Sequence, residues 1–114
     1  MAALNQILAC RDAAVRASQP FDFLLSPTSP ILPYEAELAC PGNDPHNALP
    51  HIAFTLPWNL SEQPAASLDW RFRDTGLTLG VQIVGKRFDD IGVLRLSHMI
   101  EQIRPTQRAW PFSR

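Results

Sequence analysis

Residues 65–85, Ala-Ala-Ser-Leu-Asp-Trp-Arg-Phe-Arg-Asp-Thr-Gly-Leu-Thr-Leu-Gly-Val-Gln-Ile-Val-Gly, carry the clearest structural pattern in this chain. Apolar side chains occupy the even positions of residues 65–73 and the odd positions of residues 77–83. This period of two is typical of a strand that buries one face. Because residues 74–76 (Asp-Thr-Gly) separate the two runs, the sequence predicts an antiparallel hairpin that ends at Gly85.

A helix is predicted before this hairpin, over residues 2–18. Its apolar side chains recur at helical spacing at Leu4, Ile7, Leu8 and Val15. Pro20 ends the helix because proline lacks the N–H that the helical ladder requires. The segment has no large aromatic anchor and no basic face, so a helix lying on a membrane surface is the less favoured interpretation.

A second helix is predicted after the hairpin. Asp89 or Asp90 is expected to cap its first turn, and it runs to about Arg104 before Pro105 closes it. One face of this helix is apolar, at Val93, Leu96, Ile100 and Ile103. His98 is expected to be half-buried or on the surface.

The segment between these regular parts is rich in proline: nine of the eleven prolines lie between positions 20 and 64. A short apolar run at residues 23–25 predicts a buried strand. Pro27, Pro30 and Pro33 then exclude a helix or a central strand directly after it. The chain is therefore divided into a helix (1–20), a Pro-rich strand with loops (21–64), a hairpin with a helix (65–104) and a tail (105–114).

These elements enclose only a small core. A short three-stranded sheet leaves two open edges and a large face to cover. An irregular stretch of some forty residues is usually a functional loop or lies across a larger body. The sequence therefore indicates an α/β chain that rests on more protein than it contains.

Composition excludes several classes of function. The 114 residues carry a net charge of −1, without the basic excess that nucleic-acid binding requires. No apolar run approaches the length of a bilayer span, and residues 1–16 lack the apolar block of a signal peptide. Cys10 and Cys40 make no disulfide framework. We therefore expect a cytoplasmic protein with neither nucleic acid nor membrane as a partner.

Two groups of side chains suggest chemistry, and each has a simpler explanation. Cys40, His46 and His51 are residue types that zinc accepts, but a fourth ligand at conventional spacing is missing and the prolines explain the loop. The hydroxyls of Ser26, Thr28 and Ser29 could include a nucleophile, but no base lies nearby in the sequence. A turn in which these hydroxyls satisfy backbone groups is favoured.

The charged candidates are likewise explained by local structure. Lys86, the only lysine, is next to Arg87, which favours a solvated strand end over a catalytic base. Asp89 and Asp90 are better explained by helix capping than by a pair of acid and base carboxylates. On spacing alone, the sequence shows no complete catalytic machinery.

Three stretches nevertheless resemble the C-terminal part of the amidase signature family. They are residues 21–30 (Phe-Asp-Phe-Leu-Leu-Ser-Pro-Thr-Ser-Pro), 54–67 (Phe-Thr-Leu-Pro-Trp-Asn-Leu-Ser-Glu-Gln-Pro-Ala-Ala-Ser) and 76–90 (Gly-Leu-Thr-Leu-Gly-Val-Gln-Ile-Val-Gly-Lys-Arg-Phe-Asp-Asp). Each is weak alone, but together they span nearly the whole chain in the family order. The resemblance implies part of a mixed sheet: a short strand and an antiparallel hairpin, with a helix at each end.

The resemblance also implies a function for the parent enzyme, the hydrolysis of carbon–nitrogen amide bonds by two serines and a lysine. This chain has no Gly/Ser-rich signature, and Lys86 does not match the catalytic lysine, so no catalytic residue is assigned and the chain alone is expected to be inactive. Thr28 and Asn59 are the candidate substrate-binding residues, with turn and strand-end hydrogen bonding as the alternative. The family implies no metal and no organic cofactor.

Three positions depart from the family pattern. Glu62 stands where glycine is usual, and would be strained if the backbone there requires a positive φ. Thr78 stands where proline is common. Residues 52–53 (Ile-Ala) lack the aspartate that the A subunit of the tRNA-dependent amidotransferases tends to carry before its Phe-Thr pair, which favours a general amidase.

Two roles stay open for a chain of this kind. It could supply part of an amidase or amidotransferase whose missing N-terminal catalytic portion is its partner, with a small amide as substrate. It could instead be a non-catalytic interaction module that binds a protein or itself through the open sheet.

Overall fold

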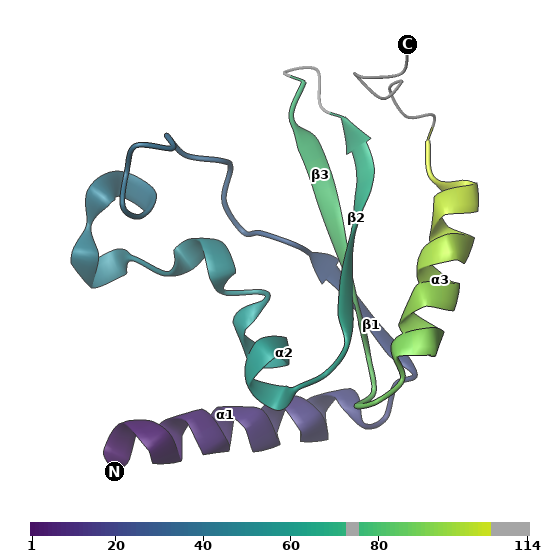
Figure 1. Ribbon diagram of the computed structural model, residues 1–114, viewed down its shortest axis with the longest axis horizontal. Coiled ribbons are helices and arrows are strands. Elements are labelled where there is room, and N and C mark those ends of the chain that lie inside the picture. The colour runs from purple at the N-terminus through teal and green to yellow at the C-terminus, as the bar shows by residue number, and fades with distance from the viewer. Residues whose placement is uncertain (73–75, 106–114) are drawn as a thin grey trace.

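The computed structural model describes residues 1–72 and 76–105. The regular elements are α1 (Ala2–Ser18), β1 (Phe23–Pro27), α2 (Leu56–Ser61), β2 (Ala65–Phe72), β3 (Thr78–Gly85) and α3 (Asp90–Ile103) (Figure 1). Three single-turn 3-10 helices, at Pro41–Asn43, Pro45–Asn47 and Pro50–Ile52, punctuate the Pro-rich segment. None of the helices in this described part is long and apolar enough to cross a membrane.

The predicted hairpin is confirmed, and β3 is its buried strand. The described strands form one antiparallel sheet in the order β1-β3-β2. β2 and β3 pair from Ala65 opposite Val84 to Phe72 opposite Thr78, with a bulge between Asp69 and Arg71. The predicted turn residues 74 and 75 lie outside the described residues.

The two faces of the sheet meet different partners. On one face Ile83 packs against Val93 and Ile100 of α3, which gives the core of the chain. Five partly buried apolar residues surround this core: Phe23, Ala66, Leu68, Trp70 and Leu96. Because side chains alternate along a strand, Gln82 and Val84 point to the opposite face. Figure 1 shows α3 and α2 on opposite sides of the hairpin.

The strand predicted at residues 23–25 is confirmed as β1, but its predicted burial is wrong. Phe23 and Leu24 are half-buried, and Leu25 is 59% exposed. The physical reason is position: within the described sheet, β1 pairs only with β3 and forms an edge. The sequence run is apolar enough for a central strand, but the described residues provide no layer to cover it.

The two long helices agree with the predicted bounds, although not with every predicted buried position. Asp89 caps α3, since its carboxylate accepts from the Gly92 N–H at 3.0 Å. Val93 and Ile100 are buried as predicted, whereas Ile103 is 74% exposed. At that end of α3 the Arg104 guanidinium donates to the backbone carbonyl of Asp69 in β2. Arg104 therefore makes a contact between α3 and the sheet there, whereas Ile103 is exposed.

Helix α1 touches the rest of the chain through its second half. Ala14 and Ser18 are its buried residues, and it packs against α2. The first half, which Figure 1 shows running away from the sheet, carries the predicted apolar stripe in the open. Its members, Leu4, Ile7 and Leu8, are each about half exposed. The described residues leave this stripe uncovered.

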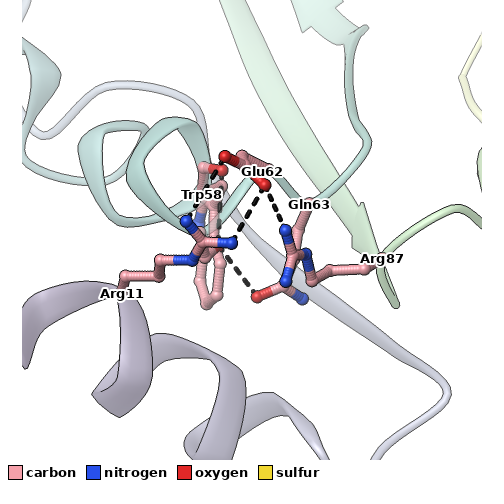
Figure 2. A network of polar contacts seen from close by, with 6 residues as sticks. Arg11, Trp58, Glu62, Gln63 and Arg87 are labelled. Carbon is pink, nitrogen blue, oxygen red and sulfur yellow. Dashed lines mark hydrogen bonds and ion pairs between the residues drawn. The ribbon is translucent and has the colours of Figure 1, made fainter. Parts of the chain in front are cut away.

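Glu62 joins three elements at the end of α2. Its backbone is left-handed, with φ 58° and ψ 32°, which confirms the positive φ expected if this position follows the family pattern. Its carboxylate accepts from Arg11 of α1 at 3.1 Å and from Arg87, just after β3. Figure 2 shows Glu62 between these two guanidinium groups. The ion pairs therefore hold a strained residue where glycine would be relaxed.

Candidate functional site

A cavity of about 240 Å³ lies between α2 and the face of the sheet that α3 does not cover. Its polar lining consists of Thr28, Thr55, Asn59, Gln63, Ser67 and Gln82. Trp58, Ala65 and Ala66 complete the lining, so no charged side chain among the described residues faces the cavity. The structure thus brings the two predicted substrate-binding residues, Thr28 and Asn59, to one hollow.

The strand register places a row of polar side chains at this cavity, two of which, Ser67 and Gln82, line it. Ser26 of β1 and Ser67 of β2 are both directly opposite Gln82 of β3. Residues directly opposite each other in a ladder share a face, with Cβ atoms about 5 Å apart. The row therefore follows from the pairing of three strands that are distant in the sequence.

Thr28 joins this row just beyond the end of β1. Its N–H donates to the Gly80 carbonyl at 3.1 Å, and its Oγ1 lies 2.8 Å from Ser67 Oγ. Gly80 permits this approach, because a Cβ there would lie 2.7 Å from Thr28 Oγ1. The Thr28–Ser67 hydroxyl pair can therefore form because position 80 of β3 carries no side chain.

Asn59 reaches the cavity from the short helix α2, which the sequence pattern did not predict. Pro57 lies in the first turn of this helix, where a missing N–H costs nothing. Asn59 Nδ2 donates to the Thr55 carbonyl at 3.2 Å. Thr28 and Asn59 thus line one cavity. The Thr28 hydroxyl bonds across the sheet to Ser67, whereas the Asn59 amide makes a local hydrogen bond to the carbonyl of Thr55.

Two buried glutamines were not predicted from the sequence. Gln63 is 8% exposed, and its amide bonds Ser18, Ser61 and the Gly85 carbonyl. Gln82 is 3% exposed, and its Nε2 donates to Ser26 Oγ and to the Phe54 carbonyl. A carboxamide in the middle of the apolar run of β3 was the available signal for Gln82.

The other candidates are dispersed over the structure. Cys40 Sγ contacts the Asp44 carbonyl, the His46 N–H donates to the Asp44 carboxylate, and the His51 ring meets Tyr34. Within residues 1–72 and 76–105, no group of three or more His, Cys, Asp or Glu side chains is arranged to hold a metal ion.

The remaining hydroxyl and charged candidates have local partners. Ser29 forms a turn with Ile31. Lys86 is exposed at the end of β3, 3.8 Å from Asp22, as expected for a solvated strand end. A wider hollow of about 960 Å³ runs along residues 25–34 of the Pro-rich segment. Its lining is largely apolar, so the convergent polar groups favour the smaller cavity as the binding site.

Comparison with known proteins identifies the family. The family model described as Amidase matches residues 2–94. The chain belongs to the amidase family. Its three-stranded antiparallel sheet with helices is accordingly part of the amidase signature fold, as solved structures of the family also indicate.

Curated relatives include the A subunit of a glutamyl-tRNA(Gln) amidotransferase from Thermodesulfovibrio yellowstonii, 34% identical over 84% of this chain and 19% of the relative. The corresponding protein from Myxococcus xanthus is 38% identical over 81% of this chain and 18% of the relative. The chain therefore spans about a fifth of the length of these relatives.

Solved structures of two differently named proteins share the fold. The A subunit of the glutamyl-tRNA(Gln) amidotransferase from Thermotoga maritima has a TM-score of 0.69 and 34% identity, over 86% of this chain and 21% of that protein. A 6-aminohexanoate cyclic dimer hydrolase, solved with its substrate, has a TM-score of 0.76 and 26% identity, over 92% of this chain and 24% of the hydrolase. The family thus includes both amidotransferase subunits and hydrolases.

Proposed function

We propose that this chain forms one wall of the substrate pocket of an amidase, as the C-terminal part of the enzyme. The observation that carries the proposal is the cavity that Thr28 and Asn59 share. The reaction would be hydrolysis of a carbon–nitrogen amide bond in the cytoplasm. The serine nucleophile and its lysine would come from a portion of the enzyme that this chain does not include.

The chain alone is expected to be inactive, because an activated hydroxyl requires a base. Three hydroxyls line the cavity. Those of Thr28 and Ser67 bond to each other, and that of Thr55 donates to the Ile52 carbonyl. No lysine or histidine of the described residues lines the cavity. A hydrolase active site also needs donors aimed at the developing oxyanion. Both requirements would be met by the partner portion.

The exposed apolar surface supports a partner. On α1 it comprises Leu4, Ile7 and Leu8, and on α3 it comprises Ile91, Leu94, Met99 and Ile103. Exposed apolar stripes on two helices of so small a structure are unusual for an isolated domain. We propose that the missing N-terminal catalytic portion covers them. Self-association through the sheet edges, as in a non-catalytic interaction module, is the second candidate.

A chimeric enzyme tests the proposal. The segment of the 6-aminohexanoate cyclic dimer hydrolase that matches this chain would be replaced by the full chain, and ring opening of the cyclic dimer measured. We expect measurable hydrolysis, reduced about tenfold by Asn59→Ala and unchanged by Ser29→Ala, which lies outside the cavity. A folded chimera no more active than the hydrolase without the segment would contradict the proposal.

Solution behaviour separates the two candidates. The isolated chain is expected to bind a hydrophobic dye and to self-associate non-specifically, because its apolar stripes are uncovered. A cooperatively folded monomer or a single defined oligomer would favour the interaction module instead.

A further inference from the structure

The amide of Gln82 is held in one orientation and keeps one unused atom. Nε2 donates to Ser26 Oγ at 3.0 Å and to the Phe54 carbonyl at 2.9 Å. A backbone carbonyl can only accept, so the amide cannot be flipped without losing that bond. The Oε1 atom accepts no hydrogen bond from the residues that the structure describes, although Gln82 is 3% exposed and lines the cavity.

The Thr28–Ser67 hydroxyl pair supplies the opposite polarity. Two hydroxyls carry two protons, and their mutual bond at 2.8 Å uses one of them. The second proton is free to be donated into the cavity. Three neighbouring polar groups are occupied: Ser26 Oγ donates to the Pro27 carbonyl, Thr55 Oγ1 donates to the Ile52 carbonyl, and Gln63 uses both ends of its amide. Asn59, which also lines the cavity, uses one Nδ2 proton within α2.

Together these groups form a fixed acceptor beside a free donor. Ser67 lies directly opposite Gln82 in the ladder, so one small group can contact both side chains. Because the described part of the chain places no charged side chain in the lining, a carboxylate or an ammonium ion would lose its hydration there without gaining a counter-charge. The site therefore favours an uncharged ligand that carries a donor and an acceptor on one edge.

We propose that Gln82 and the Thr28–Ser67 pair bind the carboxamide of a small uncharged ligand. Its N–H donates to Gln82 Oε1, and its carbonyl accepts from whichever hydroxyl keeps its proton. The cavity of about 240 Å³ holds a ligand of this size. The inference rests on the proposed function in taking this cavity for part of an amide-binding pocket, and it adds selection against charged ligands by Gln82 and Ser67.

The test is binding to the full chain, followed by the amide resonances of the ¹⁵N-labelled protein. Three probes of similar shape would be titrated: propionamide, propionate and propylammonium. We expect saturable shifts of the Gln82 side-chain amide with propionamide, and at least about tenfold weaker binding of the two ions.

Variants of the two hydroxyls should weaken propionamide binding much more together than singly. A general loss of packing would not produce this pattern. Ser67→Ala or Thr28→Val alone leaves one hydroxyl proton, so each should weaken propionamide binding about threefold or less. The double variant leaves none and should weaken it about tenfold. Ser29→Ala is the matched control and should leave binding unchanged. Gln82→Met removes the acceptor Oε1 and should also weaken propionamide binding. If the Gln82→Met protein does not fold, the Thr28 and Ser67 variants test the proposal without it.

Each outcome bears on the proposal separately from the chimera experiment. Absence of saturable binding by propionamide, equal binding of the three probes, or a double variant that binds like the parent would each overturn the carboxamide site. Binding with the predicted pattern beside an inactive chimera would uphold the site and contradict the amidase function.

Discussion

Replacing Glu62 should separate two opposing contributions to stability. Its left-handed backbone, φ 58° and ψ 32°, costs a side-chain-bearing residue about 1 kcal/mol relative to glycine. Its carboxylate pairs with Arg11 and Arg87. Glu62 is 59% exposed and the two arginines about a third, so solvent screens both pairs. Each should contribute roughly 0.5 kcal/mol, or about 1 kcal/mol together.

These magnitudes predict different results for two variants. Glu62→Ala keeps the strained backbone and loses both ion pairs, so it should be about 1 kcal/mol less stable than the parent at low salt. Glu62→Gly loses the same pairs but relieves the strain, so the two changes should nearly cancel. At about 1 M salt, where the Debye length is ~3 Å, Glu62→Ala should approach the parent and Glu62→Gly should exceed it.

The assay is urea unfolding at low and high salt, read by far-UV circular dichroism. Equal stability of the alanine and glycine variants would refute the backbone argument. A loss in Glu62→Ala that does not change with salt would refute the ion-pair argument. Arg11→Gln removes one of the two ion pairs and should reproduce about half of the salt-sensitive loss. Arg16→Gln, at an exposed arginine of the same helix, is the matched control.

Two further predictions test the core and the approach of Thr28 to the sheet. Ile83→Ala should lower the free energy of unfolding by about 2–5 kcal/mol because Ile83 is fully buried, whereas Ile91→Ala, at a 59% exposed position, should change it by less than about 0.5 kcal/mol. Urea unfolding measures both, and equal losses would show that Ile83 is not in the core. Gly80→Ala should cost about 1–3 kcal/mol because its Cβ would lie 2.7 Å from Thr28 Oγ1, and Thr28→Ala should recover part of that loss. Purely additive losses in this double-mutant cycle would contradict the steric argument.

The elements that depend on local pattern were predictable. Alternation over residues 65–83 indicated the hairpin, and Asp89 indicated the start of α3. Local pattern was less informative about burial. Leu25 and Ile103 belong to apolar runs yet are exposed, because burial depends on what lies opposite a side chain and not on the run itself.

The candidate site was predictable only in part. Thr28 and Asn59 came from the family resemblance, and their proximity came from the structure. Gln82 was visible as a polar residue in an apolar strand, but nothing local showed which of its atoms would be occupied. That depended on Phe54 and Ser26, which lie 28 and 56 residues away along the chain.

Short windows of the sequence were enough to specify the hairpin and the two long helices, because periodicity and capping are local properties of the chain. The family resemblance required three motifs in order along nearly the whole sequence. The strand order β1-β3-β2, and the row that Ser26, Gln82 and Ser67 form across it, became known only from the folded chain. The same is true of the two guanidinium groups that Glu62 meets. The physical reason is that hydrogen bonds across the sheet, and ion pairs between separate elements, join residues that only folding brings together.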